Sequence, residues 1–464
     1  MPSSSAPIIE PSSFRDPSGF VFSINENLYR QVNKCHASDY DLLIESGLYD
    51  ELTQCGLLIR HIEESVDPPR PEISYKVIRP EKIPFISYPS EWCFSQLKAA
   101  ALATLEIQRR CMTKGMSLKD CSAFNIQFRG YQPLLIDTLS IQRYDKNSPW
   151  IAYRQFCEHF LAPLALMSKI DPNFNKIYSF YLNGLPLEFT RKLLPFGSFF
   201  NLHLLIHIHL HSRFQNKYDL SLKKNNSRVT SSGLFAIVDS LEACISSLKF
   251  SSRNGFWNEY YGCNNYSLAS LDEKKILVSN YLDFVKPKTV WDVGCNRGDF
   301  TQLASSKGAQ VIAFDNDHAS VEMLYLDIVG TQSSKILPLV IDLMSPTPSF
   351  GWSNTERGAF LRRGPVDTIM ALAVVHHLVI SGGVPLVEIA KLFCSLCTTL
   401  IIEFIPDTDS QVKRMLINRK DISSSYGIES FLHCFKKYFN IIKENKIDGT
   451  ERTIFLMVSR NGEI

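Results

Sequence analysis

The chain lacks an excess of charge of either sign, a long apolar run and an ordered cysteine framework. Its 464 residues include 49 lysines and arginines against 47 aspartates and glutamates, so global charge gives no reason to expect nucleic acid as a partner. No apolar run reaches the roughly 18 residues that suggest a membrane span, so we expect none. The 12 cysteines show no disulfide spacing, and the opening Met-Pro-Ser-Ser-Ser-Ala-Pro has neither the basic nor the apolar part of a secretory signal. These features favour a cytoplasmic protein.

The length exceeds that of one typical core, so we expect more than one domain. A polar stretch over 216–233 is the best linker candidate, because it contains Lys223-Lys-Asn-Asn-Ser-Arg and Thr230-Ser-Ser-Gly. We expect an N-terminal α+β domain over 1–215, with a hairpin at 19–33 and a helix at about 95–114. A linker and bridging helix would follow over 216–250. Strand and helix patterns alternate over 251–464, which predicts an α/β domain with a mainly parallel sheet covered by helices on both faces.

The most informative stretch is a strand that runs through two glycines into a helix. A β run over 289–293 stops at Gly294, and Gly298 follows just before a helical pattern. Such a turn presents backbone N–H groups and a helix N-terminus to a ligand. The spacing is Gly-x-x-x-Gly and not the dinucleotide fingerprint. Asp292 at the strand end would repel a pyrophosphate and would favour a cationic ligand.

Further strand patterns also end on polar residues. A run over 310–314 is followed by Asp315, where a carboxylate can accept both hydroxyls of a ribose. A run over 337–341 ends at Asp342, and the runs over 368–373 and 400–404 complete a set of five strands. Several such strand ends in register are a more specific signal than one glycine loop. The alternative is an ordinary doubly wound domain with coincidental loops.

These motifs resemble those of the class I S-adenosylmethionine (SAM) methyltransferases. The resemblance implies an enzyme with a Rossmann-like domain and SAM as its cofactor. It implies that the glycine turn approaches the methionine part of SAM, and that Asp292, Asp315 and Asp342 hold its ammonium group, ribose and adenine. Aromatic faces before the motif would suit a sulfonium cation. The expected cofactor site comprises Asp292, Gly294, Cys295, Asn296, Gly298, Asp315, Asn316, Asp342, Leu343, Ala371, Trp257 and Tyr261.

Three further residues are candidates for catalysis. His376 and His377 follow the fourth strand, where the resemblance places the methyl-transfer pocket, and a histidine can remove a proton from an attacking hydroxyl. Glu403 ends the fifth strand and is a candidate for orienting the acceptor or a histidine. Alternatively, one histidine only begins a helix and Glu403 forms a salt bridge. The motifs Asn-Pro-Pro-Tyr and Asp-Pro-Pro-Tyr are absent, which favours a hydroxyl-bearing small molecule or glycan over an exocyclic amino group as acceptor. No metal site is expected.

The N-terminal half carries a second pattern. Asp120 and Asn125 are followed by Asp137, and this order resembles the catalytic loop and metal-binding aspartate of the protein-kinase fold. The resemblance is partial, because no histidine precedes Asp120, where Leu118-Lys119 stands instead, and Thr138-Leu139 replaces Phe-Gly. No glycine-rich loop is found, and the hairpin offers only Arg30 as a cation. We expect a degenerate kinase-like domain that takes a nucleotide or a protein partner. The alternative is that Asp120 caps a turn.

The resemblance extends along nearly the whole chain. Phe14-Arg-Asp-Pro-Ser-Gly-Phe-Val-Phe, Tyr153-Arg-Gln-Phe-Cys-Glu-His-Phe and 365–378 are similar to a family of bacterial two-domain proteins that includes nodulation-type methyltransferases. This similarity implies a fused architecture without identifying the acceptor. Two rival functions stay open: a catalytically silent SAM-binding scaffold, and a bifunctional kinase–methyltransferase.

Overall fold

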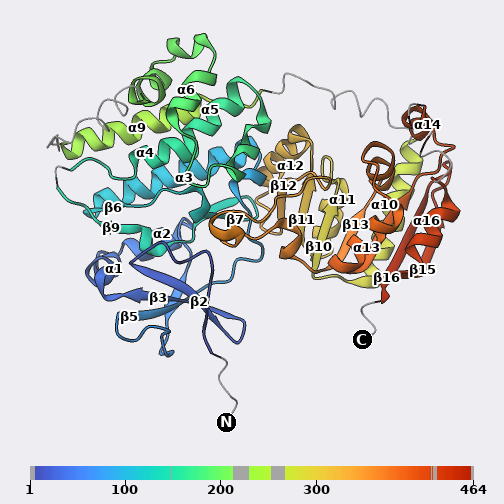
Figure 1. The fold of residues 1–464 in the computed structure, drawn as a ribbon, viewed down its shortest axis with the longest axis horizontal. Coiled ribbons are helices and arrows are strands. Elements are labelled where there is room, and N and C mark those ends of the chain that lie inside the picture. The colour runs from blue at the N-terminus through green and yellow to red at the C-terminus, as the bar shows by residue number, and fades with distance from the viewer. Residues whose placement is uncertain are drawn as a thin grey trace. The chain divides into compact units, whose positions relative to one another are not determined.

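The computed structural model describes residues 6–146, 148–212, 229–251, 267–417, 419, 421 and 426–460. The chain divides into two compact units, whose elements are labelled in Figure 1. Unit 1 comprises Met1–Arg253 and Pro348–Gly358, and unit 2 comprises Asn254–Thr347 and Ala359–Ile464. The short segment Pro348–Gly358 therefore folds with unit 1, although its neighbours in sequence on both sides fold with unit 2.

Unit 1 begins with a five-stranded antiparallel sheet in the order β1-β2-β3-β5-β4. The expected hairpin at 19–33 is confirmed by the pairing of β2 with β3. Asn25 and Glu26 join these strands with φ values of 49° and 65°, as a tight hairpin turn requires. The strands are β1 (Ile8–Ile9), β2 (Gly19–Ile24), β3 (Asn27–Asn33), β4 (His61–Glu63) and β5 (Ser74–Pro80).

The rest of unit 1 is mainly helical, with two small antiparallel pairs, β6 with β9 and β7 with β8. The pairs are β6 (Met116–Leu118), β7 (Ile126–Arg129), β8 (Gln132–Leu135) and β9 (Ile141–Arg143). The helices are α1 (Ala37–Glu45), α2 (Leu48–Gln54), α3 (Phe94–Thr113), α4 (Tyr153–Phe156), α5 (Ala162–Lys169), α6 (Leu187–Leu193), α7 (Leu202–Leu204) and α9 (Ser231–Ser247). Helix α9 packs on α3, where Arg109 pairs with Asp239 at 2.6 Å and with Glu242 at 2.5 Å. The helix expected to bridge the domains is thus part of unit 1.

Unit 2 contains a seven-stranded sheet in the order β12-β11-β10-β13-β14-β16-β15, with helices packed along it (Figure 1). Five strands are parallel, and β16 runs antiparallel to both β14 and β15. The chain starts in the middle of the sheet at β10 and proceeds outward on one side before it crosses to β13. This is the doubly wound arrangement. The strands are β10 (Thr289–Val293), β11 (Gln310–Asp315), β12 (Ile336–Val340), β13 (Val366–Ala371), β14 (Cys397–Phe404), β15 (Phe439–Lys446) and β16 (Thr453–Ser459).

The helices of unit 2 alternate with the parallel strands along the chain, except that only 3₁₀ turns separate β12 from β13. They are α10 (Leu268–Val285), α11 (Asp299–Ser306), α12 (His318–Thr331), α13 (Leu386–Leu396), α14 (Ser410–Leu416) and α16 (Ile428–Phe435). The buried Trp291 ring stacks on the Phe360 ring with centroids 4.9 Å apart. The Phe314 ring meets the Phe360 ring edge-on, with centroids 5.0 Å apart. These contacts fix β10 and β11, whose ends carry the candidate site. Among the described residues, no helix is long and apolar enough to span a bilayer.

Candidate functional site

A cavity of about 560 Å³ opens in unit 2 where the parallel strands end. It lies between the ends of β10 and β13, the two strands at which the strand order reverses. Ligands of doubly wound sheets bind at this crevice because the loops on either side diverge there. The sequence-predicted residues that line it are Asp292, Gly294, Cys295, Asn296, Asp315, Asn316, Asp342, Leu343, His376 and His377.

The turn after β10 is held by backbone hydrogen bonds to the neighbouring strand. The N–H groups of Gly294 and Cys295 both donate to the carbonyl oxygen of Phe314, at 2.9 and 3.1 Å. Gly294 has a φ of 67°, and a Cβ there would lie 2.7 Å from a methyl group of Val374. Asn296 is also left-handed, with a φ of 48°. The close approach of Val374 therefore requires glycine at 294 and brings the loop after β13 against the turn.

Gly298 has a different role from the one expected. It precedes α11 with a φ of 86°, and a Cβ there would collide with the side chain of Leu324 in α12. Gly298 does not line the cavity, and neither does Ala371, which is fully buried within β13. Gly298 lets two helices pack closely, so its effect on a ligand is indirect.

Asp292 is a buried acid at the cavity wall, with 2% of its surface exposed. The hydroxyl of Thr301 donates a hydrogen bond of 2.5 Å to its carboxyl group. Burial raises the pKa of Asp292 to about 7, because the charged form loses its hydration. A cation bound next to Asp292 would favour the ionised form and lower that pKa again.

Asp315 and Asp342 end the next two strands. The two carboxylate oxygens of Asp315 accept hydrogen bonds from the backbone N–H groups of Asn296 at 2.9 Å and Asp317 at 3.0 Å. Burial nevertheless raises the pKa of Asp315. Asp342 accepts a hydrogen bond from the N–H of Met344 at 2.9 Å. Asp315 thus ties the β10 turn to β11 and faces the cavity at the same time.

The two histidines lie side by side at the start of a short helical segment after β13, with ring centroids 4.1 Å apart. Burial lowers the pKa of both, so both rings are neutral at pH 7 and able to accept a proton. The Nδ1 atom of His376 is buried without a hydrogen-bond partner among the described residues. Ala373, two residues after β13, has a φ of 58°, a conformation that is unusual for a residue with a Cβ and is concentrated at functional sites.

Glu403 does not reach the cavity. Its side chain is fully buried and accepts a hydrogen bond of 2.7 Å from Nζ of Lys274, with Arg452 at 3.8 Å. Lys274 and Arg452 line the cavity, and Arg452 also pairs with Asp409 at 2.8 Å. Glu403 therefore forms a salt bridge, the alternative stated for it above, and holds in place two cavity-lining cations, Lys274 and Arg452, that the sequence did not indicate. Trp257 and Tyr261 lie outside the described residues.

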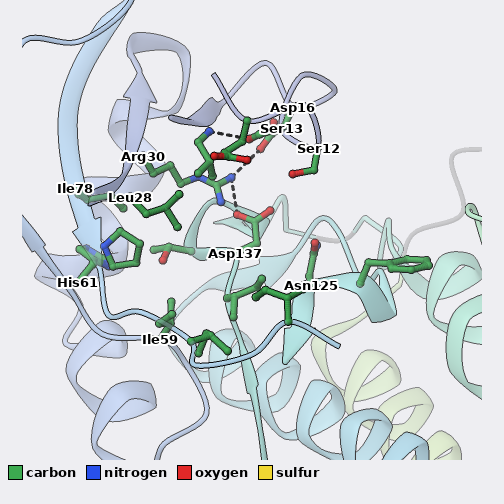
Figure 2. Close-up of a pocket in the computed structure, with 18 of the residues that line it drawn as sticks. Ser12, Ser13, Asp16, Leu28, Arg30, Ile59, His61, Ile78, Asn125 and Asp137 are labelled. Atoms are coloured by element: carbon green, nitrogen blue, oxygen red, sulfur yellow. Dashed lines mark hydrogen bonds and ion pairs between the residues drawn. The ribbon is translucent and has the colours of Figure 1, made fainter. Parts of the chain in front are cut away.

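Unit 1 contains a second and larger cavity of about 1470 Å³. The three residues of the kinase-like pattern, Asp120, Asn125 and Asp137, all line it, and Figure 2 shows Asn125 and Asp137 facing the same space. Asp120 and Asn125 lie between β6 and β7, and Asp137 follows β8. The structure therefore brings these three residues together, as their order in sequence suggested.

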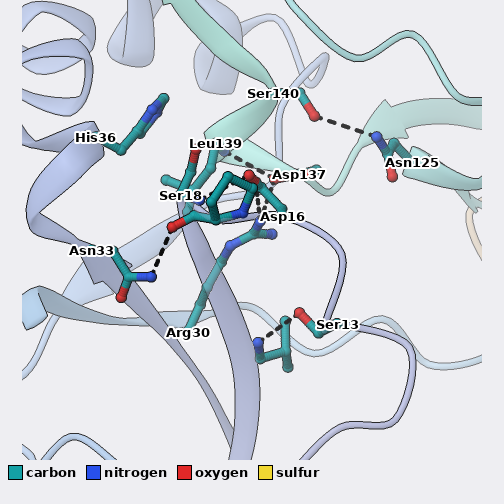
Figure 3. A network of polar contacts seen from close by, with 12 residues as sticks. Ser13, Asp16, Ser18, Arg30, Asn33, His36, Asn125, Asp137, Leu139 and Ser140 are labelled. Carbon is teal, nitrogen blue, oxygen red and sulfur yellow. Dashed lines mark hydrogen bonds and ion pairs between the residues drawn. The ribbon is translucent and has the colours of Figure 1, made fainter. Parts of the chain in front are cut away.

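The acids of this second cavity are engaged by cations and amides (Figure 3). Arg30 on β3 forms an ion pair of 2.7 Å with Asp137 and lies 3.7 Å from Asp16. Asp137 also accepts the N–H of Leu139 at 2.9 Å. Asn125 donates to the hydroxyl of Ser140 at 3.3 Å. This network links β3 to the segment that follows β8.

Fold and site together define a two-unit α/β protein whose second unit is a doubly wound domain with a cavity at its strand ends. No family model matches the sequence. The chain is 34% identical over 453 residues to the nodulation protein NoeA of Rhizobium meliloti (strain 1021), a match that covers 96% of this chain and 94% of that protein. The chain belongs to the NoeA family of nodulation proteins.

Solved structures also show limited similarity. The N-methyltransferase NodS from Bradyrhizobium japonicum WM9 is 10% identical with a TM-score of 0.32, over 42% of this chain and 98% of that chain. The bifunctional kinase-methyltransferase WbdD is 15% identical with a TM-score of 0.31, over 44% of this chain and 42% of that one. The magnesium protoporphyrin IX methyltransferase ChlM from Synechocystis PCC 6803, with bound S-adenosylhomocysteine, is 18% identical with a TM-score of 0.31. That match covers 45% of this chain and 94% of that chain. Similarities this low support no functional conclusion.

Proposed function

We propose that unit 2 binds SAM and transfers its methyl group to a hydroxyl-bearing small molecule or glycan. The observation that carries the proposal is the convergence of Asp292, Asp315 and Asp342, from three adjacent strand ends, on one cavity beside the Gly294 turn. The volume of about 560 Å³ lies within the range of roughly 300–1,000 Å³ usual for small-molecule sites. Three carboxyl groups suit a ligand that presents a cation and several hydroxyl or amino donors.

The chemical groups of SAM match the order of these residues. Asp292 would hold the ammonium group of the methionine part, next to the turn at Gly294. Asp315 would hold the ribose hydroxyls, because its oxygens accept backbone N–H groups and still have lone pairs for further donors. Asp342 would accept from the adenine amino group. Cys295, Asn296, Asn316 and Leu343 would complete the wall.

SAM supplies a methyl group on a sulfonium centre, which is transferred by in-line displacement. Most of the protein's contribution is therefore to position the acceptor. A hydroxyl acceptor must also lose its proton, and the neutral rings of His376 and His377 are in the form that accepts one. Both histidines line the cavity, and we favour His377 because it is only half-buried, whereas His376 is almost fully buried.

The proposal is tested with the full chain and methyl-labelled SAM. Cell extract is fractionated into small molecules, glycans, proteins and RNA, and label should appear in the first or second fraction. The variant His377→Ala should slow the transfer by about 10²–10⁴-fold while SAM still binds. Label in protein or RNA would refute the acceptor class. Saturable SAM binding with no label in any fraction would indicate a silent SAM-binding scaffold.

A further inference from the structure

The segment Pro348–Gly358 is anchored firmly within unit 1. Arg15 forms an ion pair of 2.6 Å with Glu356, and the N–H of Gly358 donates to the hydroxyl of Tyr88 at 2.9 Å. The ring of Phe350 packs edge-on against Tyr88, with centroids 5.7 Å apart, and against Phe124 at 6.0 Å. These contacts fix the position of Arg357, which lies between Glu356 and Gly358 in the sequence.

Arg357 lines the large cavity of unit 1. Its guanidinium lies 4.9 Å from the centroid of the Phe124 ring, and Nη1 donates to the carbonyl oxygen of Glu356 at 3.2 Å. Nε is buried and has no hydrogen-bond partner among the described residues. The carboxylate of Glu356 instead accepts from Arg15 and from the N–H of Trp352. Burial lowers the pKa of Arg357, although the nearby Tyr88, Glu356 and Asp120 favour its charged form.

Three aspartates that line the cavity already have hydrogen-bond or ion-pair partners. Asp137 is paired with Arg30, and Asp16 with Lys119 at 3.3 Å. Asp120 accepts the amide of Gln155 at 2.7 Å and the N–H of Ser122 at 2.9 Å. A divalent cation would have to displace these partners before it could be coordinated.

The cavity wall also carries free cations and an apolar side. Arg60 and Lys82 are exposed and form no ion pair within the described parts of the chain. Glu10, Glu26 and Asp50 also line the cavity, and none of them is bonded to Arg357 in those parts. Figure 2 shows one apolar side of the cavity, formed by Leu28, Ile59 and Ile78. The cavity thus offers a preorganised guanidinium together with apolar surface for the rest of a ligand.

We propose that the unit 1 cavity binds a phosphate-bearing small molecule through Arg357, and that it does so without a divalent cation. Guanidinium groups bind phosphate through two parallel hydrogen bonds, which the two Nη atoms can supply without Nε. The volume of about 1470 Å³ leaves room for a ligand much larger than the phosphate itself. This inference does not depend on the proposed methyl transfer in unit 2.

The test measures the binding of inorganic pyrophosphate to the full chain by calorimetry, in EDTA and again with Mg²⁺. Wild type should bind in EDTA, and Arg357→Met should bind about tenfold to about a hundredfold more weakly. Arg143→Gln is the matched control, because Arg143 is exposed in the same unit and does not line the cavity. Titrations with ADP and with glucose 1-phosphate then distinguish a nucleotide from a sugar phosphate.

The controls separate a binding role from a structural one. Arg357→Met retains the apolar stem over Phe124, so its melting temperature should equal or exceed that of wild type. Its affinity for SAM should stay that of wild type, because Arg357 does not line the unit 2 cavity. Three results would overturn the proposal: equal pyrophosphate affinity in Arg357→Met and wild type, no binding of any phosphate probe, or binding that requires Mg²⁺.

Discussion

Protonation of Asp292 should govern the affinity for SAM. The carboxyl group is buried beside the Gly294 turn, and burial raises its pKa from the ordinary 3.8 to about 7. An ammonium group bound there stabilises the ionised form only. SAM binding should therefore tighten as the pH rises through about 7, since a larger fraction of the protein is then ready to bind.

The size of the effect follows from the ionised fraction. With a pKa of about 7, roughly 10% of Asp292 is ionised at pH 6 and roughly 90% at pH 8. The apparent Kd should fall about fivefold between these values, or about 1 kcal/mol, because the ammonium group of SAM, with a pKa of about 8, is already about half deprotonated at pH 8. Above about pH 8 the ammonium group of SAM loses its own proton, so affinity should fall again. Calorimetric titrations from pH 5.5 to 8.5 measure this profile.

Asp292→Asn supplies the control for this prediction. The amide has the same shape and does not titrate, so the rise in affinity between pH 6 and 8 should disappear. A flat profile in wild type, or the same slope in the variant, would refute the assignment of Asp292 to the ammonium group.

The same variant tests the cause of the raised pKa. A carboxyl group with a higher pKa in the folded state destabilises the fold once it ionises. This loss of folding free energy is absent below about pH 3.8 and grows as the pH rises from there to about 7. Above about pH 7 it is constant, on the order of a few kcal/mol. Asp292→Asn should therefore raise the melting temperature at pH 8 and leave it nearly unchanged at pH 4. An equal change at both pH values would rule out burial of charge as the cause.

Two further predictions concern stability. Glu403→Gln should lower the free energy of unfolding in urea by about 3–5 kcal/mol, because it leaves the buried charge of Lys274 without its 2.7 Å partner. Glu451→Gln breaks an exposed pair and should cost less than about 1 kcal/mol, so equal losses in the two variants would contradict this account. Gly298→Ala should destabilise more than Gly308→Ala, since both positions have positive φ but only Gly298 faces a collision. Thermal unfolding measures the melting temperatures of the two variants. A larger fall in melting temperature for Gly308→Ala than for Gly298→Ala would show that packing is not the cause.

The parallel strands of unit 2 could be read from the sequence because each is a short apolar run that stops at an acid or a glycine. The run at 289–293 matches β10 residue for residue, and those near 310 and 337 match β11 and β12 within two residues. The antiparallel strands β15 and β16 were not foreseen. A turn signal, Asp448-Gly449, does lie between them, but β15 is half exposed and rich in polar residues, so it shows no apolar run.

The site was harder to predict where it depends on tertiary contacts. Lys274 lies on α10 and Arg452 just before β16, and both are placed by Glu403, more than 40 residues from either. Nothing in the local sequence indicates that three such distant residues meet. The segment Pro348–Gly358 is similar, because its membership of unit 1 depends on Arg15, Tyr88 and Phe124 and not on a pattern of its own.

The central claim is that the unit 2 cavity is a SAM site, and equilibrium binding of labelled SAM to the full chain tests it most directly. Wild type should bind one SAM per chain with saturation. Asp315→Ala should weaken binding by about a hundredfold, because it removes a charged acceptor from the ribose and from the β10 turn. Asp327→Ala, an exposed change on α12 outside the cavity, should bind as wild type does. Folded wild-type protein that shows no saturable binding, or an Asp315→Ala variant with unchanged affinity, would contradict the claim.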